Sequence, residues 1–238
     1  MSRRHPGPAR TLAVPIGALN RFPRCRTVAG VLAMPPPRTF LLPGTGADGR
    51  MFPDVWSALP GVVRVEWPRG GTWRTIPQVA DHLIREQGIT AEDTLVGVSL
   101  GGMVACEIAN RIPVAGLVLV GSCTSPAAVS PVLRAIRPLI RVVPLRLAQA
   151  LVRDSRRLEF RMFADADHRF VRAMCLAIFR WEGLRPETSV RPVTIHGRRD
   201  RVIPRVRDPD VVIDGGHMIA ATHPRECTDA ILRGSRRR

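Results

Sequence analysis

The chain has 238 residues, of which 45% are apolar and 24% are charged, which fits one globular domain and excludes a disordered or fibrous chain. Arg, Pro or Gly interrupts every apolar run before it reaches the roughly 20 residues of a membrane-spanning helix, so we expect a soluble protein without a transmembrane segment. The five cysteines are widely spaced and form no Cys-x-x-Cys pair. They indicate neither a disulfide framework nor a zinc site, and they favour a reducing, cytoplasmic location.

The formal net charge of +16 is concentrated at the two ends of the chain. Residues 1–33 hold six Arg and residues 233–238 hold four, and neither segment holds an acidic residue. Residues 124–187 hold twelve Arg against six acidic residues, and the remainder is neutral. All 36 basic residues are Arg, and Lys and Tyr are absent. A GC-rich gene explains this composition as well as binding of a ligand does. Because no basic and aromatic residues cluster together, we expect no nucleic-acid partner.

From residue 38 onward, short apolar runs alternate with helix-length segments, the pattern of a mostly parallel sheet with helices on both faces. We interpret residues 1–37 as an N-terminal extension outside the fold. It is either disordered or an artefact of the start site, in which case translation begins at Met34, and a transit peptide is a third alternative. The predicted strands are Thr39–Leu42, Val62–Trp67, Thr94–Val98, Gly116–Val120, Val193–His196 and Val211–Ile213.

Helix signals lie between these strands. Thr75 and Gln78 have the spacing of a capping box at the start of a helix, and the last helix is predicted over Met218–Leu232. The alternation stops over residues 124–187, where helical patterns and Pro breaks occur without a strand. We therefore predict an α/β core formed by residues 38–123 and 188–232, an inserted helical cap over 124–187, and a basic tail over 233–238.

One short motif indicates nucleophilic chemistry. Gly97-Val98-Ser99-Leu100-Gly101 follows a predicted strand and opens a predicted helix, which is the strand-turn-helix setting of the G-x-S-x-G motif. A serine on such a turn projects its hydroxyl above the sheet, and the two glycines let the strand and helix approach closely. The alternative is a glycine-rich loop with an incidental serine.

A serine hydroxyl needs a neighbouring base to take its proton. His217 follows the last strand in the run Asp214-Gly215-Gly216-His217 and is the histidine whose setting fits that role. Asp200, in the loop after the preceding strand, is placed to accept the second imidazole N–H and fix the tautomer. Two alternatives stay open, since Asp200 could pair with a neighbouring Arg and Asp214 is a rival acid.

A glycine-rich loop, Pro43-Gly44-Thr45-Gly46, follows the first strand. Such a loop can aim a backbone N–H at a developing oxyanion, and the amides of Thr45 and Leu100 would form a two-donor hole. The competing interpretation is a phosphate-binding loop, but the sequence has neither Gly-Lys-Ser/Thr nor a regular Gly-x-Gly-x-x-Gly motif.

Together these residues resemble the α/β-hydrolase fold superfamily over nearly all of residues 38–232, and among its members small bacterial carboxylesterases with a helical cap. The resemblance implies the order nucleophile Ser99, acid Asp200 and base His217, and hydrolysis of an ester or thioester through an acyl-enzyme without metal or organic cofactor. One departure is that Pro43-Gly44 stands where the superfamily usually has His-Gly, which removes a side chain that often braces the oxyanion loop.

The expected substrate is a small-molecule ester or thioester with a small to medium apolar acyl group. The predicted pocket residues are Phe52, Met103, Phe163 and Met218, although such side chains usually belong to the core. Arg134, Arg137 and Arg141 recur at helical spacing in the predicted cap and could contact an anionic membrane or substrate, or form a solvated helix face.

Two other classes of function remain as alternatives. One is a non-catalytic binding protein on a hydrolase scaffold. The other is a basic protein that binds nucleic acid or an anionic membrane through its Arg-rich tails and cap.

Overall fold

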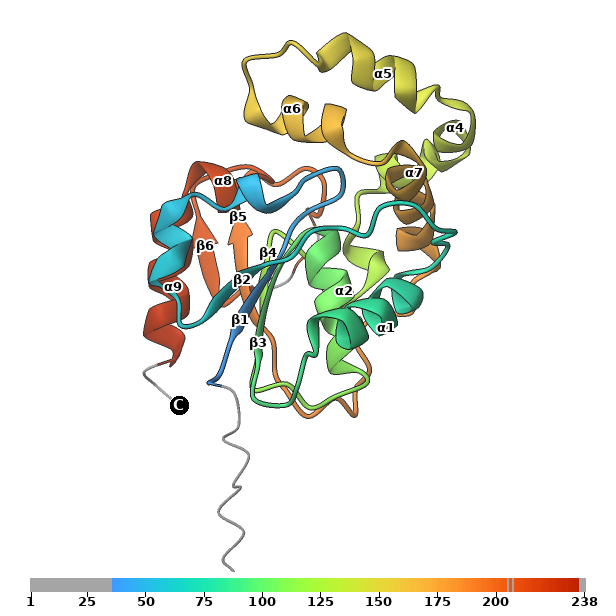
Figure 1. The fold of residues 1–238 in the computed structure, drawn as a ribbon. Coiled ribbons are helices and arrows are strands. Elements are labelled where there is room, and N and C mark those ends of the chain that lie inside the picture. The colour runs from blue at the N-terminus through green and yellow to red at the C-terminus, as the bar shows by residue number, and fades with distance from the viewer. Residues whose placement is uncertain (1–35, 205, 207, 236–238) are drawn as a thin grey trace, which may run out of the picture. The chain divides into compact units, whose positions relative to one another are not determined.

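The computed structural model describes residues 36–204, 206 and 208–235. Its sheet has the strand order β2-β1-β3-β4-β5-β6, and every neighbouring pair is parallel. Figure 1 shows the strands fanning across the core between two layers of helices. The strands are β1 (Thr39–Leu42), β2 (Val62–Arg64), β3 (Thr94–Val98), β4 (Gly116–Val120), β5 (Val193–Gly197) and β6 (Val211–Ile213). The predicted α/β class with a parallel sheet is confirmed.

The central strands are apolar on both faces because helices cover both sides of the sheet. Phe40 and Leu42 of β1 face one apolar cluster, and Leu41 between them faces the other. Helices α1 (Ile76–Gln87) and α2 (Leu100–Ala109) cover the first face, while α9 (Pro224–Ser235) and the 3-10 helix η2 (Asp54–Ala58) cover the second.

Helix α1 begins as its sequence predicts. Thr75 Oγ1 accepts a hydrogen bond from the Gln78 amide, and the Gln78 side chain accepts one from the Thr75 amide, so the capping box is complete. These bonds satisfy backbone donors that a helix N-terminus otherwise leaves unpaired. The helix ends at Gly88, whose φ of 56° is the left-handed conformation that glycine adopts at little cost.

The bounds of two predicted elements were wrong. Strand β2 stops at Arg64 rather than Trp67, because Glu66 and Trp67 leave the sheet and hydrogen-bond to the loop after β1. The predicted final helix is two helices, α8 (Ile219–Thr222) and α9, separated at His223. Pro224 causes the break, since a proline has no N–H to continue the helix and clashes with the preceding turn. Helix α9 ends at Ser235 rather than at Leu232, so it includes the first three residues of the predicted basic tail.

Between β4 and β5 the chain is helical. Figure 1 shows α4, α5 and α6 beyond the ends of the strands, on the side where β5 points. The elements of this segment are η3 (Pro126–Ala128), α3 (Pro131–Ala135), α4 (Arg137–Val142), α5 (Leu145–Val152), α6 (Leu158–Asp165), α7 (His168–Ala177) and η4 (Ile178–Arg180). A further 3-10 turn, η1 (Gly49–Met51), follows β1.

Apart from Pro36 and Pro37, the predicted N-terminal extension lies outside the described residues, as do the last three residues of the tail. In the described part of the chain, no helix is both long enough and apolar enough to cross a membrane.

Candidate active site

Ser99 lies at the turn between β3 and α2 in a backbone conformation that few serines adopt. Its φ is 51° and its ψ is −116°, and such strain in a residue with a Cβ must be held by its surroundings. The Ser99 amide donates to the Val120 carbonyl, 3.2 Å away, and the Ser99 carbonyl accepts from Ser122 Oγ at 2.6 Å. These bonds to β4 and the residues after it hold the turn in place.

The glycines of the motif are required by space. An ideal Cβ on Gly97 would lie 2.4 Å from the backbone of Gly102, and one on Gly101 would lie 2.2 Å from the Leu42 carbonyl oxygen. Only residues without a side chain allow β1, β3 and α2 to approach this closely. The sequence prediction that the glycines serve close packing is therefore supported by the distances.

The Ser99 hydroxyl is directed at a histidine. A serine at an N-cap ordinarily accepts a hydrogen bond from the first turn of its helix, but in the described chain Ser99 makes no such side-chain cap. Its Oγ lies 3.0 Å from His217 Nε2 instead. His217 Nδ1 lies 2.8 Å from Asp200 Oδ2. The structure thus brings together the three side chains that the sequence predicted, from loops after β3, β5 and β6.

The hydrogen-bond roles follow from the charge of Asp200. Burial raises the pKa of the Asp200 carboxyl, but the hydrogen bonds from His217 and from the Ile203 and Val202 amides outweigh burial and leave this pKa below its ordinary value of 3.8. An ionised carboxylate only accepts hydrogen bonds, so His217 Nδ1 carries a proton, and in the neutral imidazole Nε2 accepts from the Ser99 hydroxyl. This is the orientation in which the histidine can take a proton from serine.

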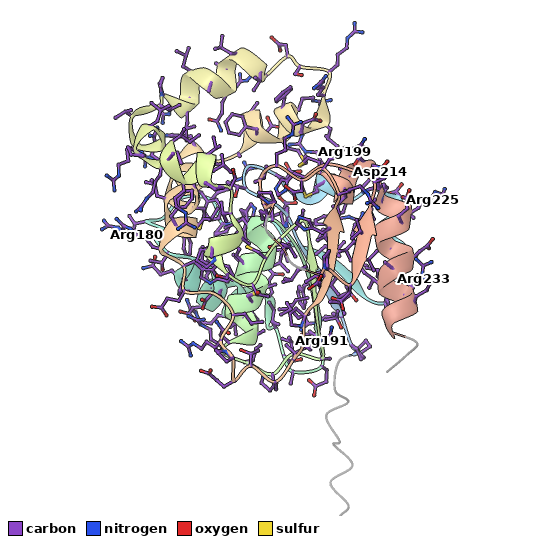
Figure 2. All side chains as sticks on the ribbon, turned by 180° about the vertical axis from the view of Figure 1, so that it is seen from behind. Arg180, Arg191, Arg199, Asp214, Arg225 and Arg233 are labelled. Atoms are coloured by element: carbon purple, nitrogen blue, oxygen red, sulfur yellow. The ribbon has the colours of Figure 1, made fainter. Side chains whose placement is uncertain are left out.

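The other carboxylate considered from the sequence lies elsewhere. Asp214 is exposed and pairs with Arg199 at 3.5 Å on the surface beside β6 (Figure 2). Asp200 forms no ion pair with an arginine among the described residues; its second neighbour is His196, whose Nε2 lies 3.5 Å from Asp200 Oδ2 and 2.8 Å from the Ile203 carbonyl oxygen. The sequence placed His196 at a strand end but did not predict this contact.

The loop after β1 passes beside Ser99. An ideal Cβ on Gly44 would lie 3.6 Å from the Ser99 Cβ. The Gly44 carbonyl accepts hydrogen bonds from Trp67 Nε1 at 3.0 Å and from the Ala47 amide at 3.2 Å. Within residues 36–235, apart from the gaps at 205 and 207, no protein acceptor is bonded to the amides of Thr45 or Leu100. Both amides therefore remain available as donors.

Comparison with known proteins identifies the family. Residues 40–230 match the model of the Alpha/beta hydrolase family, which is most of the chain. This protein belongs to the alpha/beta hydrolase family. No curated protein matches its sequence.

Solved structures share the fold of this alpha/beta hydrolase at low sequence identity. A thermophilic esterase from Thermogutta terrifontis is 21% identical, with a TM-score of 0.66 over 84% of this chain and 90% of that one. An enol-lactonase from Burkholderia xenovorans LB400 is 19% identical, with a TM-score of 0.65 over 84% and 91%. An esterase from Exiguobacterium antarcticum is 19% identical, with a TM-score of 0.63 over 83% and 91%.

A small cavity of about 100 Å³ opens beside Ser99 in this alpha/beta hydrolase. Its walls come from the core and from the helical segment between β4 and β5, and the lining side chains other than Ser99 are apolar or thiol groups. They are Met103, Val129, Leu133, Ile140, Cys175, Ile178, Phe179, Val202 and Ile203. A group that enters this space exchanges water for apolar contacts next to the serine.

Of the four predicted pocket residues, Met103 is among those that line the cavity. The other three lie elsewhere. Phe52 is buried and packs edge-on against Trp56, with 5.3 Å between ring centroids. Phe163 lies against Gly46, where an ideal Cβ would be 3.0 Å from its ring, and Met218 packs partly buried against the apolar cluster beneath α9. The sequence did not predict Leu133, Ile140 or Ile178 as pocket residues, because an ordinary aliphatic side chain carries no signal of a pocket.

No group of three or more His, Cys, Asp or Glu side chains is placed to hold a metal ion in the portion of the chain that the structure describes. Cys106, Cys123, Cys175 and Cys227 are free thiols, and Cys25 lies outside the described residues.

Proposed function

We propose that this alpha/beta hydrolase is a serine hydrolase that cleaves carboxylic esters or thioesters of apolar acyl groups through an acyl-enzyme. The observation that carries the proposal is the unbroken chain from Ser99 Oγ through His217 to Asp200, with distances of 3.0 Å and 2.8 Å. Membership of the alpha/beta hydrolase family supports hydrolysis as the class of reaction. The proposed catalytic residues are Ser99, His217 and Asp200.

In the first half of the reaction, the Ser99 oxygen attacks the substrate carbonyl carbon while His217 Nε2 takes the hydroxyl proton. The negatively charged Asp200 stabilises the resulting imidazolium and keeps its ring oriented. The tetrahedral intermediate then collapses. The bond to the leaving group breaks, and His217 returns the proton to the departing alcohol or thiol.

In the second half, water attacks the acyl-enzyme by the same steps. His217 takes a proton from the water, whose oxygen bonds to the acyl carbon. The ester bond to Ser99 breaks, and its oxygen regains a proton from His217, which releases the carboxylic acid. Each proton taken by the histidine is returned, so the protein is unchanged after one turnover.

The oxyanion that forms in both halves needs hydrogen-bond donors. We assign this role to the amides of Thr45 and Leu100, because neither is bonded to an acceptor in the described structure. Leu100 is also the first residue of α2, where the partial positive charge of a helix N-terminus favours an anion. Loss of one such donor typically costs roughly 3 kcal/mol of transition-state stabilisation.

The cavity beside Ser99 indicates the acyl group. Its volume of about 100 Å³ is well below the roughly 300–1,000 Å³ of typical ligand pockets, and its lining is apolar. We therefore expect short, unbranched acyl chains to react fastest. We further propose that residues 124–187 act as a cap, since Leu133, Ile140 and Phe179 of this segment line the cavity.

The first prediction concerns Ser99. A fluorophosphonate probe should label the wild-type protein, and Ser99→Ala should lose both this labelling and the hydrolysis of p-nitrophenyl acetate, because the nucleophile is absent. Mass spectrometry of the labelled peptide identifies the modified residue. Ser57→Ala is the matched control, since Ser57 is exposed and its hydroxyl accepts a hydrogen bond from Arg64 rather than from the site, and it should still be labelled.

Persistent labelling of Ser99→Ala would contradict the assignment. A wild-type protein that neither reacts with the probe nor hydrolyses acetyl, butanoyl and octanoyl esters or thioesters would instead support the alternative of a non-catalytic binding protein on this scaffold. The chain-length series also tests the acyl pocket, because the rate should fall from the short to the long esters.

A further inference from the structure

The apolar side chains exposed on this protein are concentrated on the helices between β4 and β5. Among the described residues, eight of the nine large exposed apolar side chains lie between positions 132 and 160, and the ninth is Val212 on β6. The eight are Val132, Ile136, Leu139, Val142, Leu147, Leu151, Leu158 and Phe160. We call these eight residues the apolar face. Exposed apolar groups gathered in this way mark an interaction surface, whereas single ones scattered over a surface do not.

The same helices carry cations that have no anionic partner. Eight arginines lie between positions 131 and 161, against only two acidic residues, Asp154 and Glu159. In the part of the chain that the structure describes, none of these arginines pairs with a carboxylate. They are Arg134, Arg137, Arg141, Arg146, Arg153, Arg156, Arg157 and Arg161.

Some arginines elsewhere on the protein have carboxylate partners. Figure 2 labels Arg191 and Arg199 in the C-terminal part of the core. Arg191 lies 3.1 Å from Asp210, and Arg199 lies 3.5 Å from Asp214. Among the described residues, the helical segment is where exposed large apolar side chains and arginines without a carboxylate partner occur together in number.

We propose that the apolar face and its arginines dock on an anionic lipid bilayer. Aliphatic side chains gain free energy by entering the boundary between headgroups and acyl chains, and arginines beside them gain by contact with anionic headgroups. The two most exposed residues of the apolar face are Val142 and Leu151, at 74% and 79%. Each lies within two residues of an arginine, Arg141 and Arg153 respectively. The docking would be peripheral.

The charge distribution favours lipid over the other occupants of such a surface. A symmetric dimer through this face would place the face against itself, and the unpaired arginines of the two copies would repel one another. Nucleic acid is recognised through stacking on aromatic side chains as well as through charge, and Phe160 is the single aromatic residue of the apolar face. An anionic bilayer satisfies the apolar and the cationic components together.

Helices α3 and α4, which carry part of the apolar face, also border the cavity beside Ser99. Leu133 of α3 and Ile140 of α4 line it, whereas Val132 and Leu139, their neighbours in sequence, are exposed. Docking through the exposed side would hold the cavity wall at the lipid surface, where apolar esters concentrate. This last consequence rests on the proposed hydrolase function, but the docking itself does not.

The test is co-sedimentation of the full-length protein with vesicles of phosphatidylcholine alone or mixed with phosphatidylglycerol. The wild type should bind the mixed vesicles and lose affinity as salt is added. Leu139→Asp combined with Val142→Asp should weaken this binding at least about tenfold. Arg141→Gln combined with Arg146→Gln should weaken it by roughly fivefold for each arginine.

Matched controls separate this surface from general charge and apolarity. Val212→Asp introduces the same charge at the exposed apolar residue outside the face, and Arg225→Gln with Arg233→Gln removes two exposed arginines of α9 (Figure 2). Both controls should bind as the wild type does. Ser99→Ala should also bind normally, so the docking is measured independently of hydrolysis. The variants at Leu139 with Val142 and at Arg141 with Arg146 should hydrolyse p-nitrophenyl acetate at the wild-type rate, which shows that they fold.

Three results would overturn the proposal. The wild type could fail to bind the mixed vesicles, or the face variants could bind as tightly as their controls, which would assign the binding to the Arg-rich ends of the chain. In the third result, the wild type is a dimer, and Leu139→Asp with Val142→Asp makes it a monomer without changing vesicle binding. The apolar face would then be the contact with a second copy of the chain.

Discussion

The smallest scale that matters for the proposed chemistry is the single hydrogen bond between His217 and Asp200. Asp200 is held on its other oxygen by the Val202 and Ile203 amides, at 2.8 Å and 2.9 Å, so its carboxylate cannot turn away from the imidazole. This rigid acceptor fixes which ring nitrogen of His217 carries the proton. The tautomer of the histidine is therefore decided by backbone amides two and three residues beyond the aspartate.

Replacing that acceptor should impair hydrolysis severely. Asp200→Asn keeps the shape of the side chain but can offer an N–H to His217 Nδ1, which favours the tautomer that cannot take the serine proton. We expect kcat for p-nitrophenyl acetate to fall by about 10³- to 10⁴-fold, as in the corresponding serine protease variant. Asp214→Asn is the control, because Asp214 is exposed and pairs with Arg199. A larger loss for Asp214→Asn would make Asp214 the acid.

Trp67 contacts the loop after β1 through one peptide group. The Gly44 carbonyl and the Thr45 amide belong to the same planar trans peptide, so they point in opposite directions. The Trp67 indole N–H and the Ala47 amide both donate to that carbonyl and thereby fix the direction of the Thr45 N–H. Pro43 has no side-chain donor for this carbonyl, and the Trp67 indole supplies one.

Trp67→Phe should lower kcat by about tenfold and change KM by less than about twofold. The proposed donor that Trp67 orients is the Thr45 amide, which would contact the oxyanion only in the transition state. The new ring can still pack against Phe170, whose centroid lies 5.4 Å from that of Trp67. Trp73→Phe removes an equivalent bond, from Trp73 Nε1 to the Gly70 carbonyl, and should leave both constants unchanged. Equal losses in the two variants, or a rise in KM alone, would contradict a positioning role.

At the scale of elements, the approach of α2 to β1 and β3 sets the position of Ser99. Helix α2 is buried along its whole length, so it cannot shift outward to admit a side chain without exposing apolar surface. Its first turn therefore depends on Gly101 and Gly102, which face the Leu42 carbonyl and the Ser122 side chain respectively.

Gly101→Ala should destabilise the fold by more than about 4 kcal/mol, because its Cβ would collide with backbone oxygens that have nowhere to move. Gly234→Ala is the matched control in helix α9, where an ideal Cβ meets no atom within 4 Å. Since alanine is the better helix former, Gly234→Ala should raise the free energy of unfolding by roughly 0.5–1 kcal/mol. Urea unfolding followed by circular dichroism measures both changes. A Gly101→Ala protein as stable as the wild type would show that the helix can move.

At the scale of the whole molecule, hydrogen-bonded carboxylates link stability to pH. Burial raises the pKa of each of five aspartates, but hydrogen bonds and nearby cations outweigh burial and leave each pKa below 3.8. They are Asp48, Asp93, Asp167, Asp200 and Asp210. Asp93, for example, accepts hydrogen bonds from Arg38 Nη2 and from the Thr90 amide, which ties the start of β1 to the loop before β3.

Acid should therefore unfold this protein. Groups whose pKa is lowered by folding stabilise the native state above their unfolded pKa of about 3.9, and this stabilisation is lost as the pH falls through the lower native values. The free energy of unfolding in urea should be steady near neutral pH and should decline below about pH 5. Asp93→Asn should be less stable at pH 7 and show a smaller decline. Stability that stays level from pH 5 to pH 3 would contradict the prediction.

Much of the fold follows from patterns that are local in the sequence. A strand that is buried on both faces must be a short apolar run, and a helix start must satisfy its own amides, so Thr39–Leu42 and the capping box at Thr75 were predicted correctly. Ser99 and His217 could be proposed for a similar reason, since the end of a parallel strand places the following loop at one edge of the sheet. Their catalytic roles remain predictions.

What the sequence could not provide depends on contacts between distant segments. Trp67 was predicted to end a strand, because nothing within a few residues reveals a carbonyl acceptor on Gly44. Helices α3 and α4 contribute to both the cavity wall and the apolar face. Leu133 and Val132 are both apolar, and only the packing of these helices decides that Leu133 lines the cavity while Val132 is exposed. The periodicity of apolar residues determines whether a segment forms a helix or a strand. The tertiary structure determines which other side chains that segment contacts, because those contacts come from distant parts of the chain.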